Sequence, residues 1–413
     1  MLLHYQVILG KMYKIRKYLI IKLRRSKVKI LVALDSNIPC GKNRALYQRC
    51  ITFLASGQAK LVVRKNVSLP DELTSHPNTY FAKLSGRLGL FIECLRLLKT
   101  GEFQAIYVWH FPFFIFLPFL LILYSKTIVS CMESQHSPYY YIDSAKFKNL
   151  FVKIAARLIF LMAKLIYPKI DLHIVMAHNN HHGLAKRLSE QFNVSIDKIL
   201  AMSNGVDIKL IQQIVSQFTD YQQNKEFIIC YVGTIRPGKG YELIEITDDI
   251  LDKIPCAKIV VAGPLRGISA DNLRRPGVEY HGIVSHTEAI RLMYNSDVCV
   301  FIGDSKIRDN EVSHPGKILE YMALGKPVIA NNYPGIKEFF AVEDQFLLYE
   351  ENDTKKIIEL LSQLQSDVNL RIKISKNMRD SVVHFDWNTI NFNFMKKLNK
   401  CLCETYETKI DSR

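Results

Sequence analysis

The sequence predicts an α/β fold built from two doubly wound domains. Short apolar, β-branched segments alternate with segments of helical spacing from residue 29 onward, and this alternation restarts after a polar stretch near residue 220. The chain of 413 residues is long enough for two domains of ordinary size, and its 48% of hydrophobic residues supports well-formed cores.

Each half of the chain repeats the strand–helix pattern. In the first half we expect strands at residues 29–34, 59–64, 105–109, 127–132 and 170–176, and helices at 44–55, 91–99, 115–124 and 147–167. In the second half we expect strands at 227–232, 257–262, 278–281 and 297–302, and helices at 241–254 and 289–295. The polar residues 212–224 lack a strand pattern and are the predicted linker.

The charge balance is strongly basic, with 55 Lys and Arg against 39 Asp and Glu and a formal net charge of +16. Such an excess attracts nucleic acid, an anionic membrane face or phosphorylated substrates. The basic residues alternate with aliphatic ones instead of clustering with stacking aromatics, so nucleic acid is not an expected partner. The nine cysteines are irregularly spaced, which favours free thiols in a reducing compartment.

Membrane contact is predicted at the surface of a bilayer rather than across it. Residues 1–28 mix cations with Leu, Ile and Tyr, as a basic amphipathic leader does, although a poorly ordered leader fits equally well. The helix expected at 147–167 carries only basic charges. No stretch reaches the ~20 uninterrupted apolar residues of a spanning helix.

The most informative segment is residues 314–330, which read HPGKILEYMALGKPVIA. Pro315 has a φ suited to the first position of a helix, and Gly325 suits its C-terminal cap. The N–H groups of a helix start bind anions such as a diphosphate. Glu320 lies on the same helix face as Lys317, and its carboxylate can accept hydrogen bonds from two neighbouring sugar hydroxyls. Without its context, the segment would also fit an ordinary helix–strand unit with a surface Lys–Glu pair.

A second basic, glycine-rich segment is the loop from Gly233 to Gly240, between an expected strand and an expected helix. Glycines let a backbone approach a ligand closely, and Arg236 and Lys239 supply two cations for a diphosphate leaving group. A basic surface loop is the alternative interpretation.

The segment 314–330 resembles the nucleotide-sugar signature of family-four glycosyltransferases, and Gly233–Gly240 resembles the Gly-x-x-x-Pro-x-Lys-Gly loop of the same group 1 type. This resemblance implies a GT-B fold, with two Rossmann-like domains facing a cleft. The implied organisation is a basic leader at 1–28, an acceptor-binding domain at 29–215, a nucleotide-sugar-binding domain at 225–385, and a C-terminal helix and tail at 386–413.

Two positions depart from the family pattern. The Arg that often follows the first glycine of the loop is Thr234, and the first of two glutamates in the signature is replaced by Val312.

The resemblance also implies site residues. The donor-binding candidates are Gly41, Arg236, Lys239, Gly263, Pro315, Gly316, Lys317, Ile318 and Glu320. The catalytic candidates are Glu133, His136 and His110, each at or after a strand end, although a structural role is an open alternative for each. His178, His181 and His182 have spacing that suits a metal, but no carboxylate or Cys accompanies them, and we expect neither a metal nor a cofactor.

The implied activity is that of a retaining glycosyltransferase of the hexosyltransferase type. It would move a sugar from a nucleotide-diphosphate sugar to a saccharide or lipid-linked acceptor, in the synthesis of a cell-surface polysaccharide or glycolipid. We expect it in the cytoplasm, peripheral at the inner face of an anionic membrane. The alternatives are a non-catalytic nucleotide-sugar-binding or partner subunit, and a sugar-nucleotide epimerase of the same fold.

Overall fold

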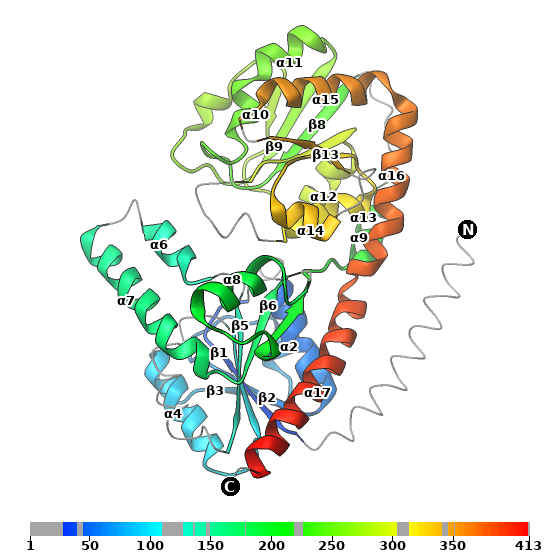
Figure 1. Cartoon of the computed structure of the whole chain (residues 1–413). Helices are drawn as coiled ribbons and strands as arrows, with labels where there is room; N and C mark the ends of the chain where they lie inside the picture. Colours follow the sequence, from blue (N-terminus) through cyan, green and yellow to red (C-terminus); the bar gives the residue numbers. More distant parts are fainter. Residues whose placement is uncertain are drawn as a thin grey trace. The chain divides into compact units, whose positions relative to one another are not determined.

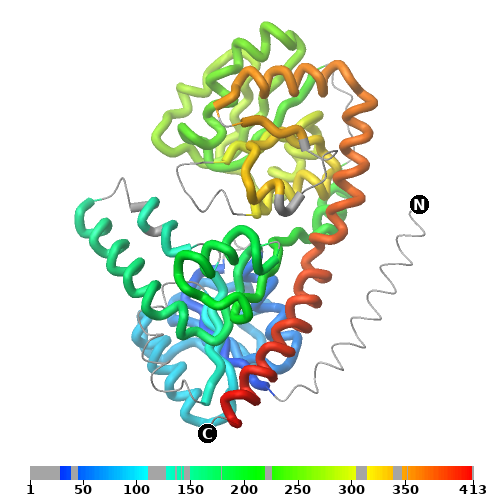
Figure 2. The backbone as a smooth tube through the Cα atoms, in the orientation of Figure 1, coloured from blue at the N-terminus to red at the C-terminus, as the bar shows by residue number. Residues whose placement is uncertain are grey.

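The computed structural model describes residues 28–38, 44–109, 127–134, 137–145, 149–177, 179–218, 226–303, 314–340, 346–350 and 352–411. The chain forms two compact units (Figure 1). The N-terminal unit comprises Met1–Ser137, Arg157–Met202 and Asn388–Arg413, and the C-terminal unit comprises Pro138–Ala156 and Ser203–Trp387. The final helix, red in Figure 2, therefore belongs to the N-terminal unit.

A seven-stranded parallel sheet forms the centre of the N-terminal unit, in the order β3-β2-β1-β4-β5-β6-β7. Its strands are β1 (Ile30–Leu34), β2 (Ala59–Val63), β3 (Thr79–Phe81), β4 (Ala105–Trp109), β5 (Val129–Ser134), β6 (Leu172–Met176) and β7 (Ile199–Met202). Every residue of β1 and β4 is buried, which explains why these strands are continuous apolar runs in the sequence.

Helices cover both faces of this sheet. The connections β3 to β4, β5 to β6 and β6 to β7 run in one direction along the sheet, whereas β1 to β2 runs in the other. Because parallel crossovers are right-handed, α4 (Gly86–Leu98), α7 (Leu150–Ile166) and α8 (Gly183–Phe192) share one face, and α2 (Arg44–Ser56) lies on the opposite one. The last helix, α17 (Trp387–Asp411), joins α2, where the Phe53 and Phe394 rings lie 6.1 Å apart. Figure 1 shows the two sets of helices on opposite sides of the sheet. The short helix α3 (Asp71–Thr74) also belongs to this unit, whereas α6 (Tyr139–Ala145) is part of the C-terminal unit.

The C-terminal unit is built around a six-stranded parallel sheet in the order β10-β9-β8-β11-β12-β13. Its strands are β8 (Phe227–Val232), β9 (Ala257–Ala262), β10 (Val278–Tyr280), β11 (Val298–Phe301), β12 (Val328–Asn331) and β13 (Phe346–Tyr349). Its helices are α9 (Ile208–Val215), α10 (Tyr241–Glu245), α11 (Thr247–Lys253), α12 (His286–Tyr294), α13 (Gly316–Leu324), α14 (Pro334–Phe340), α15 (Thr354–Ser366) and α16 (Val368–Val382).

The predicted fold class, two doubly wound α/β domains, is confirmed. Two details differ from the expectation, and a third prediction is not tested. The helix predicted at 241–254 is divided into α10 and α11 at Ile246. The residues from Gln212 onward, predicted as linker, begin inside α9, whose Ile211 and Ile214 are buried in the C-terminal core. The helix predicted at 115–124 lies outside the described residues.

The structure also describes the apolar character of the helices and the state of the cysteines. Among the helices that the structure describes, none combines the length and the apolar character needed to cross a bilayer. The eight described cysteines are all free thiols.

Candidate donor-binding site

The C-terminal sheet reverses its strand order between β8 and β11, because the chain runs from β8 outward to β10 and then crosses to β11. Ligands of doubly wound sheets bind at the carboxyl ends of the strands beside such a reversal. The segments after these two strands are the Gly233–Gly240 loop and the signature that leads into α13. Both segments singled out in the sequence therefore belong to this edge of the sheet.

The predicted signature helix is confirmed. It runs as α13 from Gly316 to Leu324, and Gly325 ends it in the left-handed conformation, with φ +66°. Pro315 precedes the first turn as the N-cap residue, one position earlier than predicted, with φ −72° and ψ 116°. Ile318 is fully buried, which fixes this helix against the core of the unit.

The entry to α13 is held by hydrogen bonds from the turn at Asn204. The backbone N–H of Asn204 donates to His314 Nδ1 at 3.1 Å, and the Asn204 side chain donates to the His314 carbonyl at 3.4 Å. A side chain at Gly316 would meet Asn204 Nδ2 at 3.0 Å. The absence of a Cβ at Gly316 therefore lets the helix start close to this turn.

The Gly233–Gly240 loop is folded back on itself and pressed against the next strand. Arg236 and Lys239 exchange backbone hydrogen bonds of 3.0 and 2.8 Å, which closes a tight turn carrying both cations. Gly263, at the end of β9, has φ +138°, and a Cβ there would lie 1.9 Å from the Gly233 carbonyl oxygen. Gly263, which the sequence analysis proposed as a donor-binding residue, is thus a point of close approach between two backbone segments.

Lys317 joins α13 to the end of β8. Its ammonium donates to the Val232 carbonyl and lies 5.7 Å from the Tyr231 ring centroid. A Cβ at Gly233 would collide with the Lys317 Nζ, at 2.0 Å, so this glycine makes room for the ammonium. Burial, aided by the nearby charge of Lys239, lowers the pKa of Lys317 to about 8. The positive charge of Lys239 therefore acts on Lys317.

Glu320 is held by a residue that sequence reasoning missed. His286, the first residue of α12, shares a hydrogen bond of 2.9 Å between its Nε2 and Glu320 Oε1. Both side chains are only partly exposed, 24% for His286 and 19% for Glu320. The signal available in the sequence was the Ser285-His286 pair at a helix start, because Ser285 caps α12 through the Glu288 N–H at 3.1 Å.

The catalytic candidate Glu133 lies in a buried network of the N-terminal unit. The strand predicted at 127–132 continues to Ser134, so Glu133 is inside β5 rather than after it. Its carboxylate accepts from Arg49 Nε at 3.1 Å and from the Tyr107 hydroxyl. Burial raises the pKa of Glu133, and the Arg49 charge opposes that shift. These contacts are those of a carboxylate that holds a sheet to its covering helix.

The other candidates of this unit, Gly41, His110 and His136, lie outside the described residues, as do Val312 and His178. The strands that precede Gly41 and His110 are β1 and β4, which are neighbours at the reversal of strand order in the N-terminal sheet.

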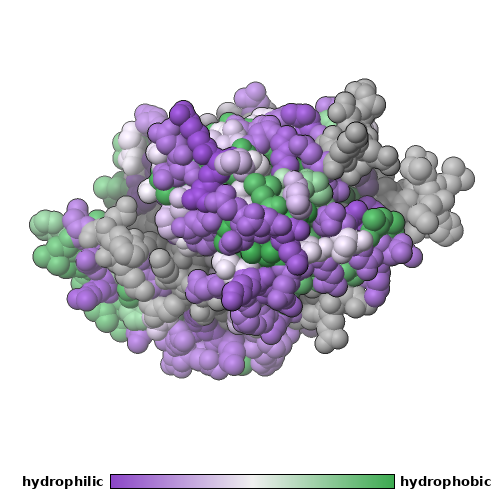
Figure 3. Space-filling view, turned by 90° about the horizontal axis from the view of Figure 1, so that it is seen from above, coloured by the Kyte–Doolittle hydropathy of each residue, from purple (hydrophilic) through white to green (hydrophobic). Residues whose placement is uncertain are grey.

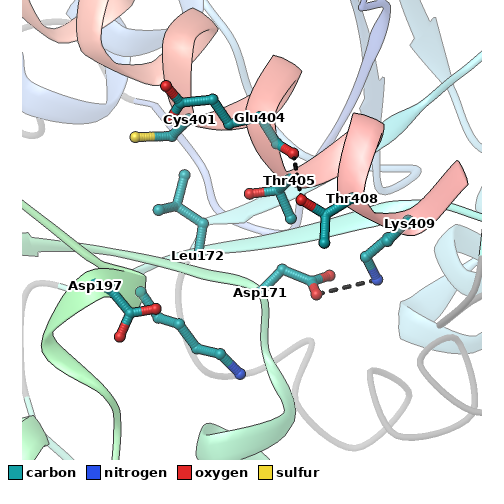
Figure 4. A pocket seen from close by; sticks show the side chains of 9 residues that line it. Asp171, Leu172, Asp197, Cys401, Glu404, Thr405, Thr408 and Lys409 are labelled. Atoms are coloured by element: carbon teal, nitrogen blue, oxygen red, sulfur yellow. Dashed lines mark hydrogen bonds and ion pairs between the residues drawn. The ribbon is translucent and has the colours of Figure 1, made fainter. Parts of the chain in front are cut away.

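A cavity of about 410 Å³ in the N-terminal unit lies at the opposite, amino-terminal edge of its sheet (Figure 4). Its walls come from the start of β6, the segment before β7 and α17. Asp171 there binds Lys409 at 3.0 Å and accepts from the Ser130 hydroxyl at 2.7 Å, and Lys198 donates to the Pro168 carbonyl at 2.9 Å. The charges lining this cavity are therefore committed to internal contacts.

Residues 216–381 match the family model described as Glycosyl transferases group 1. The chain has the GT-B fold, and its residues 216–381 are similar to a group 1 glycosyltransferase domain. The resemblance identified from the signature and the glycine-rich loop is thereby confirmed.

Solved structures show the same fold over nearly the whole chain. HepE from Anabaena, in complex with UDP, is 17% identical with a TM-score of 0.67, covering 90% of this chain and 100% of HepE. Sucrose-phosphate synthase from Thermosynechococcus elongatus is 16% identical with a TM-score of 0.65, covering 91% and 100%. WaaG, a glycosyltransferase involved in lipopolysaccharide biosynthesis, is 11% identical with a TM-score of 0.58, covering 89% and 98%. No curated protein matches the sequence.

Within the residues described here, no group of three or more His, Cys, Asp or Glu is arranged to hold a metal ion. His181 and His182 contact Asn179 Oδ1 instead, through the backbone N–H of His181 at 2.8 Å and through Nδ1 of His182 at 2.8 Å.

Proposed function

We propose that this protein transfers a sugar, with retention of the anomeric configuration, from a nucleotide-diphosphate sugar bound at the carboxyl edge of the C-terminal sheet. The observation that carries the proposal is the convergence of Lys317, Lys239 and Glu320 at the reversal between β8 and β11. HepE, solved with UDP and with UDP-glucose, supports a uridine nucleotide as the first donor to test.

The roles follow from charge. Negative charge builds on the leaving diphosphate, and preorganised cations stabilise it most effectively where water is excluded. Lys317 and Lys239 supply that charge, Arg236 adds to it, and the backbone N–H groups of Gly316 and Lys317 border the anion. Glu320, oriented by His286, accepts hydrogen bonds from paired hydroxyls of the ribose. Gly41 is proposed to admit the diphosphate, His110 and His136 are proposed as catalytic residues, and the transfer is proposed to require neither a metal nor a cofactor.

We further propose a saccharide or lipid-linked acceptor and a role in making a cell-surface polysaccharide or glycolipid, with the enzyme peripheral at the cytoplasmic face of an anionic membrane. The net charge of +16 supports the membrane proposal, and WaaG offers a precedent for a related fold in glycolipid synthesis.

A donor panel with a membrane extract as the acceptor source tests this function. We expect one labelled nucleotide sugar to raise the melting temperature and to label a saccharide or lipid product. Donor binding without any product would indicate a non-catalytic binding subunit. Conversion of the free donor into another sugar nucleotide would indicate an epimerase.

A further inference from the structure

One helix, α7, exposes a continuous apolar stripe, and its residues from Arg157 onward belong to the N-terminal unit. Along α7, large apolar side chains recur at alternating spacings of three and four residues, and all of them are 46–81% exposed: Phe151, Ile154, Leu158, Leu161 and Leu165. The face that packs on the protein is a different one, where Ala156, Ala163 and Ile166 are buried. In Figure 3, hydrophobic residues gather at the left margin, the side on which α7 lies in Figure 1. Exposed leucines repeated at this spacing are the pattern of a helix face that something else covers.

A second helix on the same face of the sheet repeats this pattern. Leu84, Leu88 and Ile92, spaced by four residues at and along α4, are 56%, 57% and 42% exposed. Tyr80 and Phe81 belong to the edge strand β3, which leads to α4, and are also 39% and 38% exposed. The crossover argument given above places α4 and α7 on one face of the N-terminal sheet, opposite α2 and α17. The two stripes are therefore presented on the same side of this unit.

The exposed charged side chains on α4 and α7 are all basic. Lys153, Arg157 and Lys164, spaced by four and seven residues, line one edge of the α7 stripe, and residues 149–166 contain no Asp or Glu. In residues 79–99, the one carboxylate, Glu93, is buried and paired with Arg96 at 2.5 Å. Exposed Leu and Ile bordered only by cations complement a surface that is apolar inside and anionic outside, which describes a bilayer with acidic headgroups.

We propose that α4 and α7 together form the face by which the protein docks on an anionic bilayer. The proposal rests on the function proposed above, because it names the surface that would bring a lipid-linked acceptor to the enzyme. The leucines enter the boundary between headgroups and acyl chains while the cations contact the lipid phosphates. The leader at 1–28 is not required for this contact.

Flotation of the full chain with vesicles tests the docking face, using phosphatidylcholine alone or mixed with phosphatidylglycerol. One variant, Leu161→Glu/Leu165→Glu, places two carboxylates on the α7 stripe, and a second, Leu88→Glu/Ile92→Glu, does so on α4. The matched control, Val368→Glu/Ile372→Glu, adds the same charges at the same spacing on α16, where the two side chains are 52% and 60% exposed.

We expect the unmodified protein and the control to float with the anionic vesicles only, and less at high salt. Each docking-face variant should bind these vesicles about tenfold or more weakly, because it replaces inserted leucines by charges that the lipid repels. Equal flotation of the variants and the control overturns the proposal, as does equal binding to neutral vesicles. If light scattering finds a dimer that either variant dissociates, the face is an interface between copies and the proposal is wrong.

The same variants separate this proposal from the donor-site assignment. Their affinity for the nucleotide sugar, measured by calorimetry, should equal that of the unmodified protein. If the unmodified protein floats but binds no nucleotide sugar, the proposed function fails while the docking face stands.

Discussion

Replacing Glu320 by Ala should abolish most donor binding while leaving the fold intact. The carboxylate is proposed to accept two hydrogen bonds from ribose hydroxyls, and a hydrogen bond to a charged group contributes about 1.5 kcal/mol or more. The loss of two such bonds, about 3 kcal/mol, corresponds to roughly 150-fold weaker binding. Titration calorimetry with the nucleotide sugar measures this change, and unmodified affinity in the variant would refute the assignment of Glu320.

His286 allows a sharper test, because it contacts Glu320 at 2.9 Å. His286→Ala should weaken donor binding by about tenfold, because the loss of one charge-assisted hydrogen bond leaves the Glu320 carboxylate less well oriented. His286→Gln should recover part of the affinity, since the Gln amide nitrogen can reach the position of Nε2. In the Glu320→Ala background, His286→Ala should have no further effect. Additive losses would show that His286 acts independently of Glu320.

The matched control for both variants is Glu288→Ala. Glu288 lies on the first turn of the same helix as His286, and its ion pair with Arg291 at 2.5 Å is partly exposed. Donor affinity should be unchanged there. The melting temperatures of all three single variants should stay close to that of the unmodified protein, because exposed ion pairs contribute about 0–1 kcal/mol to stability.

Three further predictions concern named cations. Lys239→Ala and Arg236→Ala should each lower the transfer rate by about 10- to 100-fold without changing the melting temperature, and normal turnover of Lys239→Ala would contradict the diphosphate assignment. Donor affinity should fall as the pH rises above about 8, because the Lys317 ammonium, whose pKa is lowered to about 8, loses its proton there, whereas Lys317→Met should bind weakly without this pH step. The free energy of unfolding should change in the opposite direction and rise between about pH 8 and 10.5. In that range Lys317 has lost its proton in the folded state but keeps it in the unfolded chain. Arg49→Ala should lower the free energy of unfolding by about 3–5 kcal/mol, because it leaves the buried Glu133 carboxylate unpaired.

Each of these predictions has its own check. Steady-state kinetics with thermal unfolding separates rate from stability for the loop cations, and calorimetry between pH 6 and 9.5 follows the Lys317 step. Urea unfolding measures the Arg49 effect, with Lys29→Ala as the control, since the Lys29–Glu102 pair at 3.2 Å is well exposed. A loss equal to that of Lys29→Ala would show that the Arg49–Glu133 pair is not needed for stability.

The sequence predicted the signature helix because its ends are determined locally. Gly325 supplies a left-handed cap, and Pro327 follows where a helix cannot continue, so neighbouring residues alone set the boundaries of α13. The all-buried strands β1 and β4 were predictable for a similar reason, since a run of apolar residues is enough to identify them. Strand β3 was missed because it has only three residues, too few to show an apolar or alternating pattern.

The contacts that complete the candidate site depend on the tertiary fold, and no local pattern encodes them. His286 reaches Glu320 across 34 residues because α12 and α13 pack beside each other, and that neighbourhood follows from the strand order. Glu133 was assigned by its place near a strand end, but the strand was longer than its apolar run, since Ser134 extends it. The buried partners Arg49 and Tyr107 come from other elements, so the sequence offered no sign that this carboxylate was already paired.

The glycines around the candidate donor site allow close backbone packing around the ammonium of Lys317. Gly263 brings β9 against the Gly233 carbonyl, and Gly233 leaves space for the Lys317 ammonium. This crowding takes the ammonium out of water, which lowers its pKa and makes an arriving diphosphate a better partner than the Val232 carbonyl that now accepts its hydrogen bond. A side chain at Gly233 would collide with this ammonium, and one at Gly263 would collide with the Gly233 backbone. The close packing of β8, β9 and α13 and the readiness of Lys317 to bind an anion therefore have the same physical origin.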